Sequence, residues 1–526
     1  MKRKGITTIC LTIILMASIF VGVLEPTKGS ENDPIEIYDW HDLDEVRSWD
    51  NLNANYVLMN DLDKNTDGYN ELVDTENGWN PLAYSYKAFQ GTFDGQGNEI
   101  KNLYINRSGE NPTGEDDDGL FRRSKGIIKN IGLVDVNVTG DKHVGGLVGK
   151  ITGGTLSNTY VTGNVRGEKS VGGLVGWNTR GNISHSHVAV EVNGYADGEN
   201  IGGLVGRNGG LVSNSYATGD VSGYQYVSGL AGQNNDLISN SYATGNISGE
   251  NLVGGLVGKH LYGNITNTYA TGDVNGSKNV GGLIGTLITP VSSGPSNNVS
   301  NSYSTGKVSG NVNVCGLIAS GGNQRVLNCF WNTETSGINE SECELACGTG
   351  KTTEEMKDVA TFTDNSTEEL KEPWDFVDNP NDDEGEDDLW DIDENTNDGY
   401  PFLTQKEENT FQLVINIEGE GTVEVDGEEV EDGEEQEYVE YTELTLEAVG
   451  DDSWEFDEWT GTDETGKEIT ITMDEYAEIT AVFEEVGEDD DENGKDEGVG
   501  IPGFSLLLLL TAAIVAVALY DKNGKK

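Results

Sequence analysis

The sequence predicts an all-β protein, in which a parallel β-helix solenoid of about nine coils is followed by a small β domain. The first observation is a phrase, Gly-Gly-Leu-Val-Gly and then Ser-Asn-Ser-Tyr-Ala-Thr-Gly, that recurs every 26 to 34 residues. The second is that each copy holds two or three short runs rich in Val, Ile, Thr and Tyr, punctuated by Gly or Asn-Gly. The third is that no copy has a helix-length periodic stretch. Such units bury their apolar faces only by stacking on one another.

Two positions of the repeated phrase define its phase. The Leu recurs as Leu120, Leu147, Leu174, Leu204, Leu230, Leu256, Leu283 and Leu317, after a first equivalent at Phe93. The Asn recurs as Asn102, Asn130, Asn158, Asn214, Asn240, Asn267, Asn301 and Asn328, with His185 in the one gap. Stacked strands lie about 4.8 Å apart, so we expect one Asn at the same corner of every coil, bonded to the turn and to the next Asn. We interpret this ladder as structural and not catalytic.

Several segments of the repeat region resemble a known family. The runs Val171–Gly176 (VGGLVG) and Asn214–Gly219 (NSYATG) resemble the GLUG repeat. The flanking segments that also resemble it are Phe89–Gly95, Cys329–Gly337, Gly350–Met356 and Gly399–Leu403. The resemblance covers about residues 35 to 405. It implies a bacterial or archaeal surface protein, or a companion of a secreted peptidase, whose repeats carry no chemistry themselves.

The acidic C-terminal third also contains a foldable segment. Residues 411–486 show strand-like alternation, a hairpin turn at Asp426-Gly427 and an aromatic run from Trp454 to Gly461. We interpret these aromatics as core packing and not as a sugar platform. The segment resembles the divergent internalin B-repeat, or bacterial repeat domain, although Glu458 stands where that family has a small residue. The resemblance implies a β-grasp-like spacer or adhesive module.

These features divide the chain into seven segments. They are a signal peptide (1–29), an N-terminal cap with the first strands (30–90), the GLUG-repeat β-helix (91–333), an acidic capping or linker region with a short helix (334–405), the divergent B-repeat domain (411–486), an acidic spacer (487–500) and a sorting signal or anchor (501–526). In the N-terminal cap we expect a helix from His41 to Trp49, opened by a capping box of Asp42 with Glu45 and covering the first coil.

The two ends of the chain predict an extracellular location. Lys2, Arg3 and Lys4 precede the apolar run 6–24, which is typical of a secretory signal cleaved near Gly29. The other end has an acidic spacer, then the motif formed by Pro502, Gly503 and Phe504, an apolar run and terminal lysines. This tail resembles the archaeal PGF-CTERM signal, which implies processing by an archaeosortase-like enzyme and replacement of the tail by a lipid. A plain membrane anchor is the alternative.

Acidic residues are concentrated outside the repeats. The formal net charge is −60. Residues 140–330 hold 10 Lys and Arg against 9 Asp and Glu, whereas residues 331–526 hold 9 against 60. A polyanion of this size repels nucleic acid and anionic lipid, so we exclude nucleic-acid partners. Solvation in a salty medium and loading with divalent cations both account for the acidity, and we favour the first.

Four cysteines remain after signal removal, namely Cys315, Cys329, Cys343 and Cys347. An even number in an exported chain suggests two disulfides, with three possible connectivities. Because all four lie in or just after the last coil, we expect them to staple the open end of the solenoid, where strand edges are unpaired.

One loop matches a calcium-binding pattern. The spacing D-x-[DN]-x-[DN]-G is met from residue 63, with candidate ligands Asp63, Asn65, Asp67, Tyr69, Glu71 and Asp74. Asp replaces the usual final Glu, and no helix-length pattern flanks the loop. A structural calcium ion near the N-terminal cap is therefore a hypothesis, and we expect no other cofactor.

The search for catalytic motifs is negative. The zinc peptidase motif His-Glu-x-x-His is absent from the sequence, which argues against a peptidase. The acids of the repeats share no common phase, whereas polysaccharide-cleaving sites need clustered acids. We therefore expect a non-enzymatic surface protein of the cell envelope, in S-layer-like structure or adhesion to glycans or proteins. The alternative is a carbohydrate-active enzyme on the β-helix. Sequons that suggest a glycoprotein occur at Asn106, Asn137, Asn182, Asn246, Asn264, Asn275, Asn298, Asn339 and Asn365.

Overall fold

The structure is a computed structural model. It describes residues 34–48, 51–108, 116–288, 298–321, 325–339, 341, 343, 348–377, 388–404, 410–425, 427–439, 442–450, 453–462, 465–473 and 476–485. The predicted signal peptide, the acidic spacer, the motif Pro502-Gly503-Phe504 and Cys347 lie outside these residues. None of the helices in the described ranges is long and apolar enough to cross a membrane.

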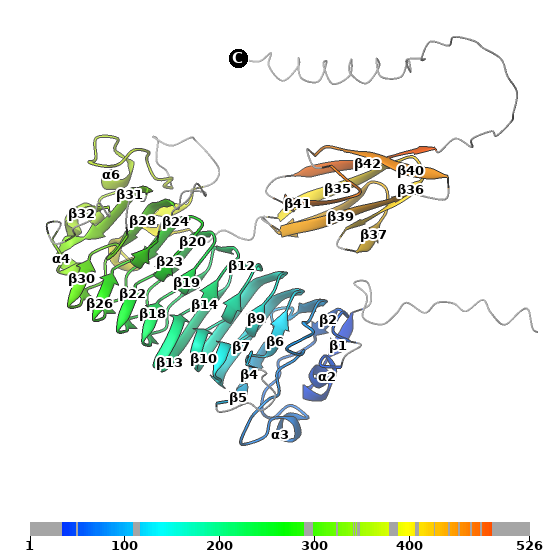
Figure 1. Cartoon of the computed structure of the whole chain (residues 1–526), viewed down its shortest axis with the longest axis horizontal. Coiled ribbons are helices and arrows are strands. Elements are labelled where there is room, and N and C mark those ends of the chain that lie inside the picture. Colours follow the sequence, from blue (N-terminus) through cyan, green and yellow to red (C-terminus); the bar gives the residue numbers. More distant parts are fainter. Residues whose placement is uncertain are drawn as a thin grey trace, which may run out of the picture. The chain divides into compact units, whose positions relative to one another are not determined.

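Residues up to 404 form a parallel β-solenoid with a cap at each end, which confirms the predicted fold class (Figure 1). One wall is a seven-stranded sheet with one strand per turn: β6 (Phe121–Ser124), β9 (Val148–Ile151), β11 (Val175–Asn178), β14 (Val205–Asn208), β19 (Ala231–Asn234), β23 (Val257–His260) and β27 (Ile284–Leu287). The solenoid therefore has about seven full turns and not nine. Isolated bridges such as Leu82 to Phe121 and Ile284 to Ile318 extend it by a partial turn at each end.

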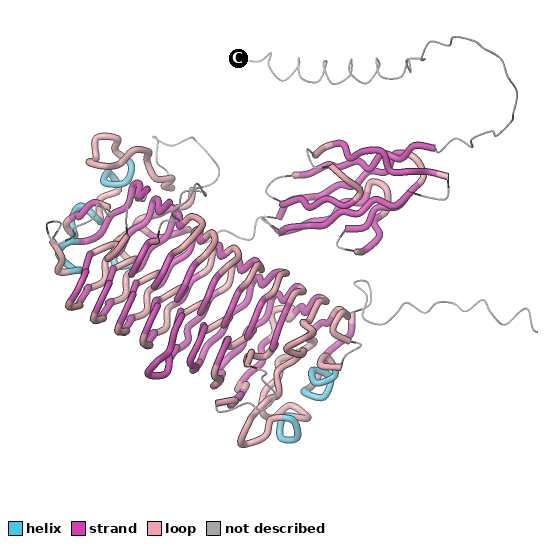
Figure 2. Tube along the Cα trace, viewed as in Figure 1, coloured by secondary structure: helices cyan, strands magenta, loops and turns pink. Residues whose placement is uncertain are grey.

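The other walls belong to one continuous parallel sheet (Figure 2). Its early strands are β1 (Ile35–Ile37), β2 (Tyr56–Leu58), β3 (Thr92–Asp94), β4 (Glu99–Lys101), β5 (Tyr104–Asn106), β7 (Ile127–Thr139), β8 (Lys142–Gly145), β10 (Thr155–Gly172), β12 (Asn182–Ser184) and β13 (His187–Gly202). Its later strands are β15 (Val212–Ser213), β16 (Tyr216–Ala217), β17 (Val221–Ser222), β18 (Gln225–Ser228), β20 (Ile238–Ala243), β21 (Ile247–Ser248), β22 (Asn251–Gly254), β24 (Ile265–Ala270), β25 (Val274–Asn275), β26 (Lys278–Gly281), β28 (Asn298–Ser304), β29 (Val308–Ser309), β30 (Val312–Cys315), β31 (Arg325–Asn332) and β32 (Thr349–Lys351).

The recurring Asn occupies one corner of the turns, as predicted. Each of these Asn residues, and His185 in their place, has a positive φ between 43 and 61°. Asn tolerates this left-handed conformation because its short amide hydrogen-bonds locally. The amides also bond from rung to rung: the Nδ2 of Asn267 donates to Oδ1 of Asn240 (3.1 Å), and Asn301 donates to Asn267 (3.2 Å). The register of the strands is therefore reinforced by identical side chains.

A second amide ladder lies inside the solenoid. Asn178, Asn208 and Asn234 are fully buried, and each donates from Nδ2 to a carbonyl of its own turn. Asn178 donates to Asn208 (2.9 Å), and Asn208 donates to Asn234 (2.8 Å). His260 replaces Asn in the next rung, where its Nδ1 meets the Nδ2 of Asn234 at 3.1 Å and its Nε2 lies 3.2 Å from the carbonyl of Gly263. These contacts require a neutral imidazole that accepts at Nδ1 and donates at Nε2.

The N-terminal cap differs in detail from the prediction. Helix α2 spans Trp40–Glu45, and its N-cap is Asp39, whose carboxylate accepts from the amides of His41 and Asp42. Asp42 is thus the third residue of the helix and not its cap, and it accepts from the amide of Tyr38. The predicted N-cap was wrong because the sequence has an Asp at both residue 39 and residue 42, and either can cap a helix that starts nearby. A further turn, α3 (Tyr69–Leu72), follows.

The C-terminal cap is a compact region with several short helices. It contains α4 (Thr333–Ser336), α5 (Thr353–Met356), α6 (Ala360–Thr363), η2 (Asn397–Gly399) and the hairpin strands β33 (Trp390–Asp391) and β34 (Phe402–Leu403). Its buried aromatics, including Phe362, Trp374 and Trp390, form one cluster with Tyr269 and Tyr303 of the solenoid. The last Asn of the corner ladder, Asn328, is closed by the cap, because its Oδ1 accepts from the amide of Lys371 (2.8 Å).

Residues 410–485 form a separate all-β module. Its two four-stranded sheets have the orders β38-β35-β42-β40 and β37-β36-β39-β41. The strands are β35 (Thr410–Glu418), β36 (Gly421–Val425), β37 (Glu428–Val430), β38 (Glu434–Val439), β39 (Thr442–Gly450), β40 (Trp454–Thr460), β41 (Glu468–Met473) and β42 (Ala477–Glu485). A β-grasp places a helix across its sheet, and the described part of this module has none. Of the aromatics in the run from Trp454, Trp459 is buried, whereas Trp454 and Phe456 are half-buried, so the core interpretation holds in part. The Phe456 ring contacts those of Trp459 and Phe483.

We expect His260 to make the solenoid sensitive to acid. Burial lowers the pKa of His260 from 6.5 to about 4. The unfolded chain therefore takes up a proton at a higher pH than the folded chain does, so folding stability present above pH 6.5 is lost as the pH falls from about 6.5 to about 4. The loss is on the order of 3 kcal/mol. Thermal unfolding of the wild type and of His260→Asn across this range measures it.

His260→Asn restores the amide of the inner ladder and removes the titration, so its melting temperature should fall less than that of the wild type between pH 7 and pH 4. The control is His41→Asn, because the His41 side chain is 46% exposed. Parallel curves for the wild type and His260→Asn would contradict the assignment.

Candidate functional site

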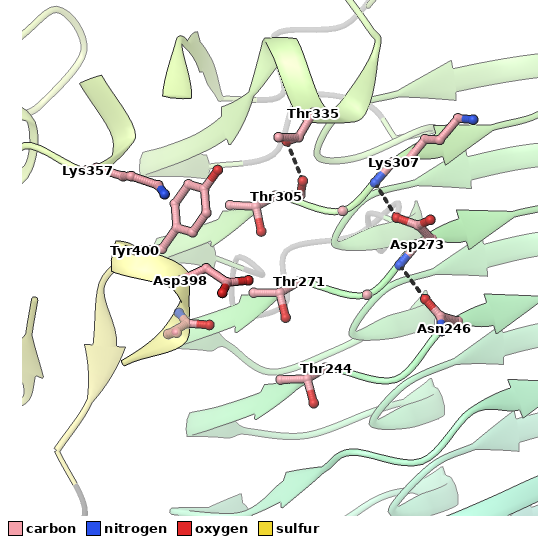
Figure 3. A pocket seen from close by; sticks show the side chains of 13 residues that line it. Thr244, Asn246, Thr271, Asp273, Thr305, Lys307, Thr335, Lys357, Asp398 and Tyr400 are labelled. Carbon is pink, nitrogen blue, oxygen red and sulfur yellow. Dashed lines mark hydrogen bonds between the residues drawn. The ribbon is translucent and has the colours of Figure 1, made fainter. Parts of the chain in front are cut away.

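A polar site lies between the solenoid and the C-terminal cap (Figure 3). It is a groove of about 590 Å³. Its lining residues are Thr244, Asn246, Thr271, Gly272, Asp273, Thr305, Gly306, Lys307, Thr335, Lys357, Asn397, Asp398 and Tyr400. The groove is lined by hydroxyl, amide and charged groups from both the repeats and the cap, and its lining includes no histidine or cysteine.

The solenoid wall of the groove is built by the Ala-Thr-Gly part of the repeat. Thr244 and Thr271 occupy equivalent places in successive turns, as Figure 3 shows. The Gly that follows is required, since a Cβ on Gly272 would lie 1.8 Å from the carbonyl oxygen of Gly245. Without a side chain there, the turns approach closely and the hydroxyls form a row along the solenoid axis.

The residue that follows this Gly in each turn belongs to a further hydrogen-bonded ladder. The carboxylate of Asp220 accepts from the amide of Asn246 (2.8 Å), and Asn246 Oδ1 accepts from the amide of Asp273 (3.2 Å). Asp273 in turn accepts from the amide of Lys307 (2.9 Å), as drawn in Figure 3. The carboxylate of Asp273 on the solenoid wall therefore accepts a hydrogen bond from the backbone of the following rung.

The cap wall presents Tyr400, Lys357 and Asp398. The Nζ of Lys357 lies over the Tyr400 ring, 4.7 Å from its centroid, and the Tyr400 hydroxyl accepts from Asn332 (2.9 Å). Asn397 donates to the Tyr303 hydroxyl (2.6 Å), which joins this wall to the solenoid. These bonds fix the cap wall, so the groove is preformed.

Beside the Thr row runs a stack of aromatic rings. Tyr160, His187, Tyr216, Tyr242, Tyr269 and Tyr303 lie one above the other, with centroids 4.6 to 5.4 Å apart and planes within 8° of parallel. Each inner ring has both faces covered by its neighbours, so only ring edges and hydroxyls face outward. Sugars bind aromatic residues through the ring face, and this stack is therefore a structural ladder. Burial under the cap raises the pKa of Tyr303 well above its usual value.

The predicted calcium ligands are not gathered around a common point. The carboxylate of Asp63 accepts from the amides of Asn65 and Thr66, and that of Asp74 accepts from the amides of Glu76 and Asn77. Tyr69 turns inward to donate to the carbonyl of Asn102, and Glu71 faces His41 at 3.6 Å. Asp67 accepts from the amide of Gly68. The described residues contain no group of three or more His, Cys, Asp or Glu that could hold a metal. The pattern marks turns here, because Asp and Asn also form Asx turns.

The cysteines do not all pair as expected. Cys315 is bonded to Cys343, which ties the last coil to the following loop. Cys329 is free and buried, so the expectation of two disulfides that include it is corrected. It sits beside Ser302 in register, and its thiol donates to the carbonyl of Leu327 (3.1 Å), just as Ser302 donates to that of Ser300 (2.7 Å). Cys329 thus takes the place of the Ser or Thr that precedes the stacked aromatic residue in the earlier repeats, a signal present in the sequence.

The comparisons with known families agree with this architecture. The GLUG motif matches residues 140–166, 167–193, 197–222 and 249–275. The chain contains GLUG repeats. The divergent InlB B-repeat domain matches residues 411–487, which are the all-β module. The two resemblances seen in the sequence are confirmed, and the first three GLUG matches fall on consecutive turns of the solenoid.

Two curated relatives are each similar to a part of this chain. One is halomucin of Haloquadratum walsbyi, with 34% identity over 142 residues that cover 26% of this chain and 2% of halomucin. The other is a putative Gly-rich membrane protein of Evansella cellulosilytica, with 39% identity over 201 residues that cover 36% of this chain and 21% of that protein. The chain thus spans much less than two thirds of either relative.

We expect Cys329 to resist alkylation in the folded protein. Burial raises the pKa of its thiol to about 12, so almost no reactive thiolate is present at pH 8. Iodoacetamide followed by peptide mass spectrometry should label Cys329 only after denaturation. Under the same non-reducing conditions Cys315 and Cys343 should appear as one linked peptide pair, and rapid labelling of Cys329 in the native protein would contradict the packing.

Proposed function

We propose that the protein is a non-enzymatic cell-surface protein with a structural or adhesive role in the envelope. The observation that carries the proposal is the use of the repeated polar side chains. Asn of the corner, Ser of the interior and Asp of the groove wall all bond to the adjacent rung. Groups used in this way are positioned by the fold and are not available as a reaction centre. A long, ridged and polar flank remains for binding partners.

The surface location is supported by the two ends of the sequence and by the relatives. A signal-like N-terminus and an acidic, PGF-CTERM-like tail predict export and anchoring through the C-terminus, by an archaeosortase-like enzyme or by a membrane segment. One relative is named halomucin, and the other is named a putative Gly-rich membrane protein. Envelope glycans or proteins are the partners that such a location offers.

The groove favours one alternative function, a carbohydrate-active enzyme. Asp273 and Asp398 both line it, and glycoside hydrolysis generally uses two carboxylates. Against this, the Asp273 carboxylate already accepts from the amide of Lys307.

We expect the protein to be exposed on intact cells. Proteinase added to whole source cells should degrade it, as followed with an antibody against residues 411–486, while a cytoplasmic marker stays intact. Degradation only after lysis would contradict the surface location.

The purified protein should release no new reducing or unsaturated ends from neutral or acidic polysaccharides. Turnover that Asp398→Asn abolishes would establish the enzyme instead, and a product yield equal in both proteins would indicate a contaminant.

A further inference from the structure

One wall of the solenoid carries a row of six residues, four of them cations, which we call the basic stripe: Arg123, Lys150, Trp177, Arg207, Gln233 and Lys259. These residues are register partners on β6, β9, β11, β14, β19 and β23, so they form one line along the solenoid axis. All are half-buried except Gln233, which is buried. The row contains no acidic residue, in a chain whose net charge is −60.

Three of these cations have no anionic partner in the described residues. Arg123 pairs with Asp117, which also contacts His143. By contrast, no described carboxylate lies within ion-pair distance of Lys150, Arg207 or Lys259. The Nε of Arg207 is buried and has no hydrogen-bond acceptor among the described residues. A buried donor without an acceptor is costly, which indicates a site that a ligand completes.

Aromatic rings hold these cations in place. The Trp177 ring lies between its two neighbours in the row, with Lys150 Nζ 3.9 Å and Arg207 Cζ 5.0 Å from its centroid. Lys259 Nζ lies 4.8 Å from the centroid of Tyr226. Cation–π contacts position the charges without neutralising them. The stripe is therefore pre-organised.

Like charges in register on neighbouring strands destabilise a sheet. Burial and the nearby charges of Arg123 and Arg207 lower the pKa of Lys150, although Asp117 opposes this shift. In this row Arg123 and Lys150 lie on neighbouring strands, and Arg207 and Lys259 follow Lys150 on every second strand. An anion bound along the stripe would relieve the repulsion.

The spacing of the unpaired cations suggests the form of the anion. Lys150, Arg207 and Lys259 lie on every second strand of this wall, so they are roughly 10 Å apart along the axis. The repeats around them are nearly neutral, with 10 basic and 9 acidic residues in 140–330. A straight polymer with one anionic group per two units matches such a row.

We propose that the basic stripe binds a linear anionic glycan that carries one carboxylate or sulfate per disaccharide. Lys150, Arg207 and Lys259 would contact successive anionic groups, and the sugar units between them would lie over the intervening strands. The inference deepens the proposed function, because it names a ligand class and a site for the adhesive role outside the cell. The site is distinct from the groove under the cap.

The test uses the whole protein and immobilised hyaluronan, which has one carboxylate per disaccharide. Binding is measured by biolayer interferometry at 0.15 M and 1 M NaCl. The wild type should bind, and the triple variant Lys150→Gln/Arg207→Gln/Lys259→Gln should bind at least about tenfold more weakly. Raising the NaCl concentration should weaken hyaluronan binding by the wild type more than binding by the variant, because fewer charges remain in the variant.

The matched control removes three charges from the neighbouring corner, as Lys142→Gln/Lys169→Gln/Lys278→Gln. Lys142 and Lys169 already pair with Asp116 and Glu168, so this variant should bind within about twofold of the wild type. Equal loss in both variants would overturn the stripe in favour of general charge attraction. Unchanged binding in the stripe variant, with the wild-type melting temperature, would also overturn it.

Competitors identify the occupant. Neutral dextran, poly-glutamate and single-stranded DNA, each at equal charge or mass, should displace the protein from hyaluronan poorly. If poly-glutamate or DNA displaced the protein as efficiently as free hyaluronan does, the glycan assignment would be overturned. A wild type that binds source-cell surfaces but no anionic glycan would overturn the stripe proposal and leave the surface function intact. Protection from external proteinase would overturn the surface function whatever the stripe binds.

Discussion

The structure depends on one constraint, the in-register stacking of its rungs. Parallel pairing places each residue beside its equivalent in the next turn, such as Tyr242 beside Tyr269. A side chain chosen at one position must therefore be compatible with its own copy about 4.8 Å away. Asn, Ser, Thr and Tyr satisfy this requirement because they bond or stack on themselves. Glycine satisfies it where backbones approach too closely for a Cβ, as at Gly272.

The same constraint separates structural from functional residues. A polar residue that bonds to the adjacent rung stabilises the rod and loses its freedom to react, as Asp273 and Cys329 illustrate. Residues that differ from their register partners in the adjacent rungs are therefore the ones most informative about function. His260 differs in this way inside the rod, where burial keeps the imidazole neutral. Lys150, Arg207 and Lys259 differ in this way on the outer wall, where no described carboxylate neutralises them.

Much of the fold was predictable from sequence, because repetition shows the phase directly. The Leu and Asn series gave the solenoid, the corner and the positive φ of Asn240 without any tertiary information. The sequence also contained the reason for the free thiol, since Asn328-Cys329-Phe330 aligns with Asn301-Ser302-Tyr303. The number of cysteines did not reveal this, because an even number suggests disulfide pairs without regard to where each cysteine lies within the repeat.

Features set by contacts distant in sequence were not predictable. The groove exists because Asn397 and Tyr400 return to a wall built almost 100 residues earlier, where Asn397 bonds to Tyr303. The loop from Asp63 has calcium-like spacing, yet its carboxylates face backbone amides, and spacing alone does not distinguish the two uses. The basic stripe appears in the sequence as isolated Lys and Arg residues, which only the register brings into one row.

The stacking itself is tested most directly by a distance across several rungs. Asn193, Ser222, Ser248, Asn275 and Ser309 are successive register partners, so Asn193 and Ser309 should lie roughly 19 Å apart although 116 positions separate them in sequence. Double electron–electron resonance between spin labels at these two sites, in a Cys347→Ser background, measures this distance. The account predicts one narrow distribution near this value, widened only by the label arms. A broad distribution, or a main distance beyond about twice this value, would contradict the in-register solenoid.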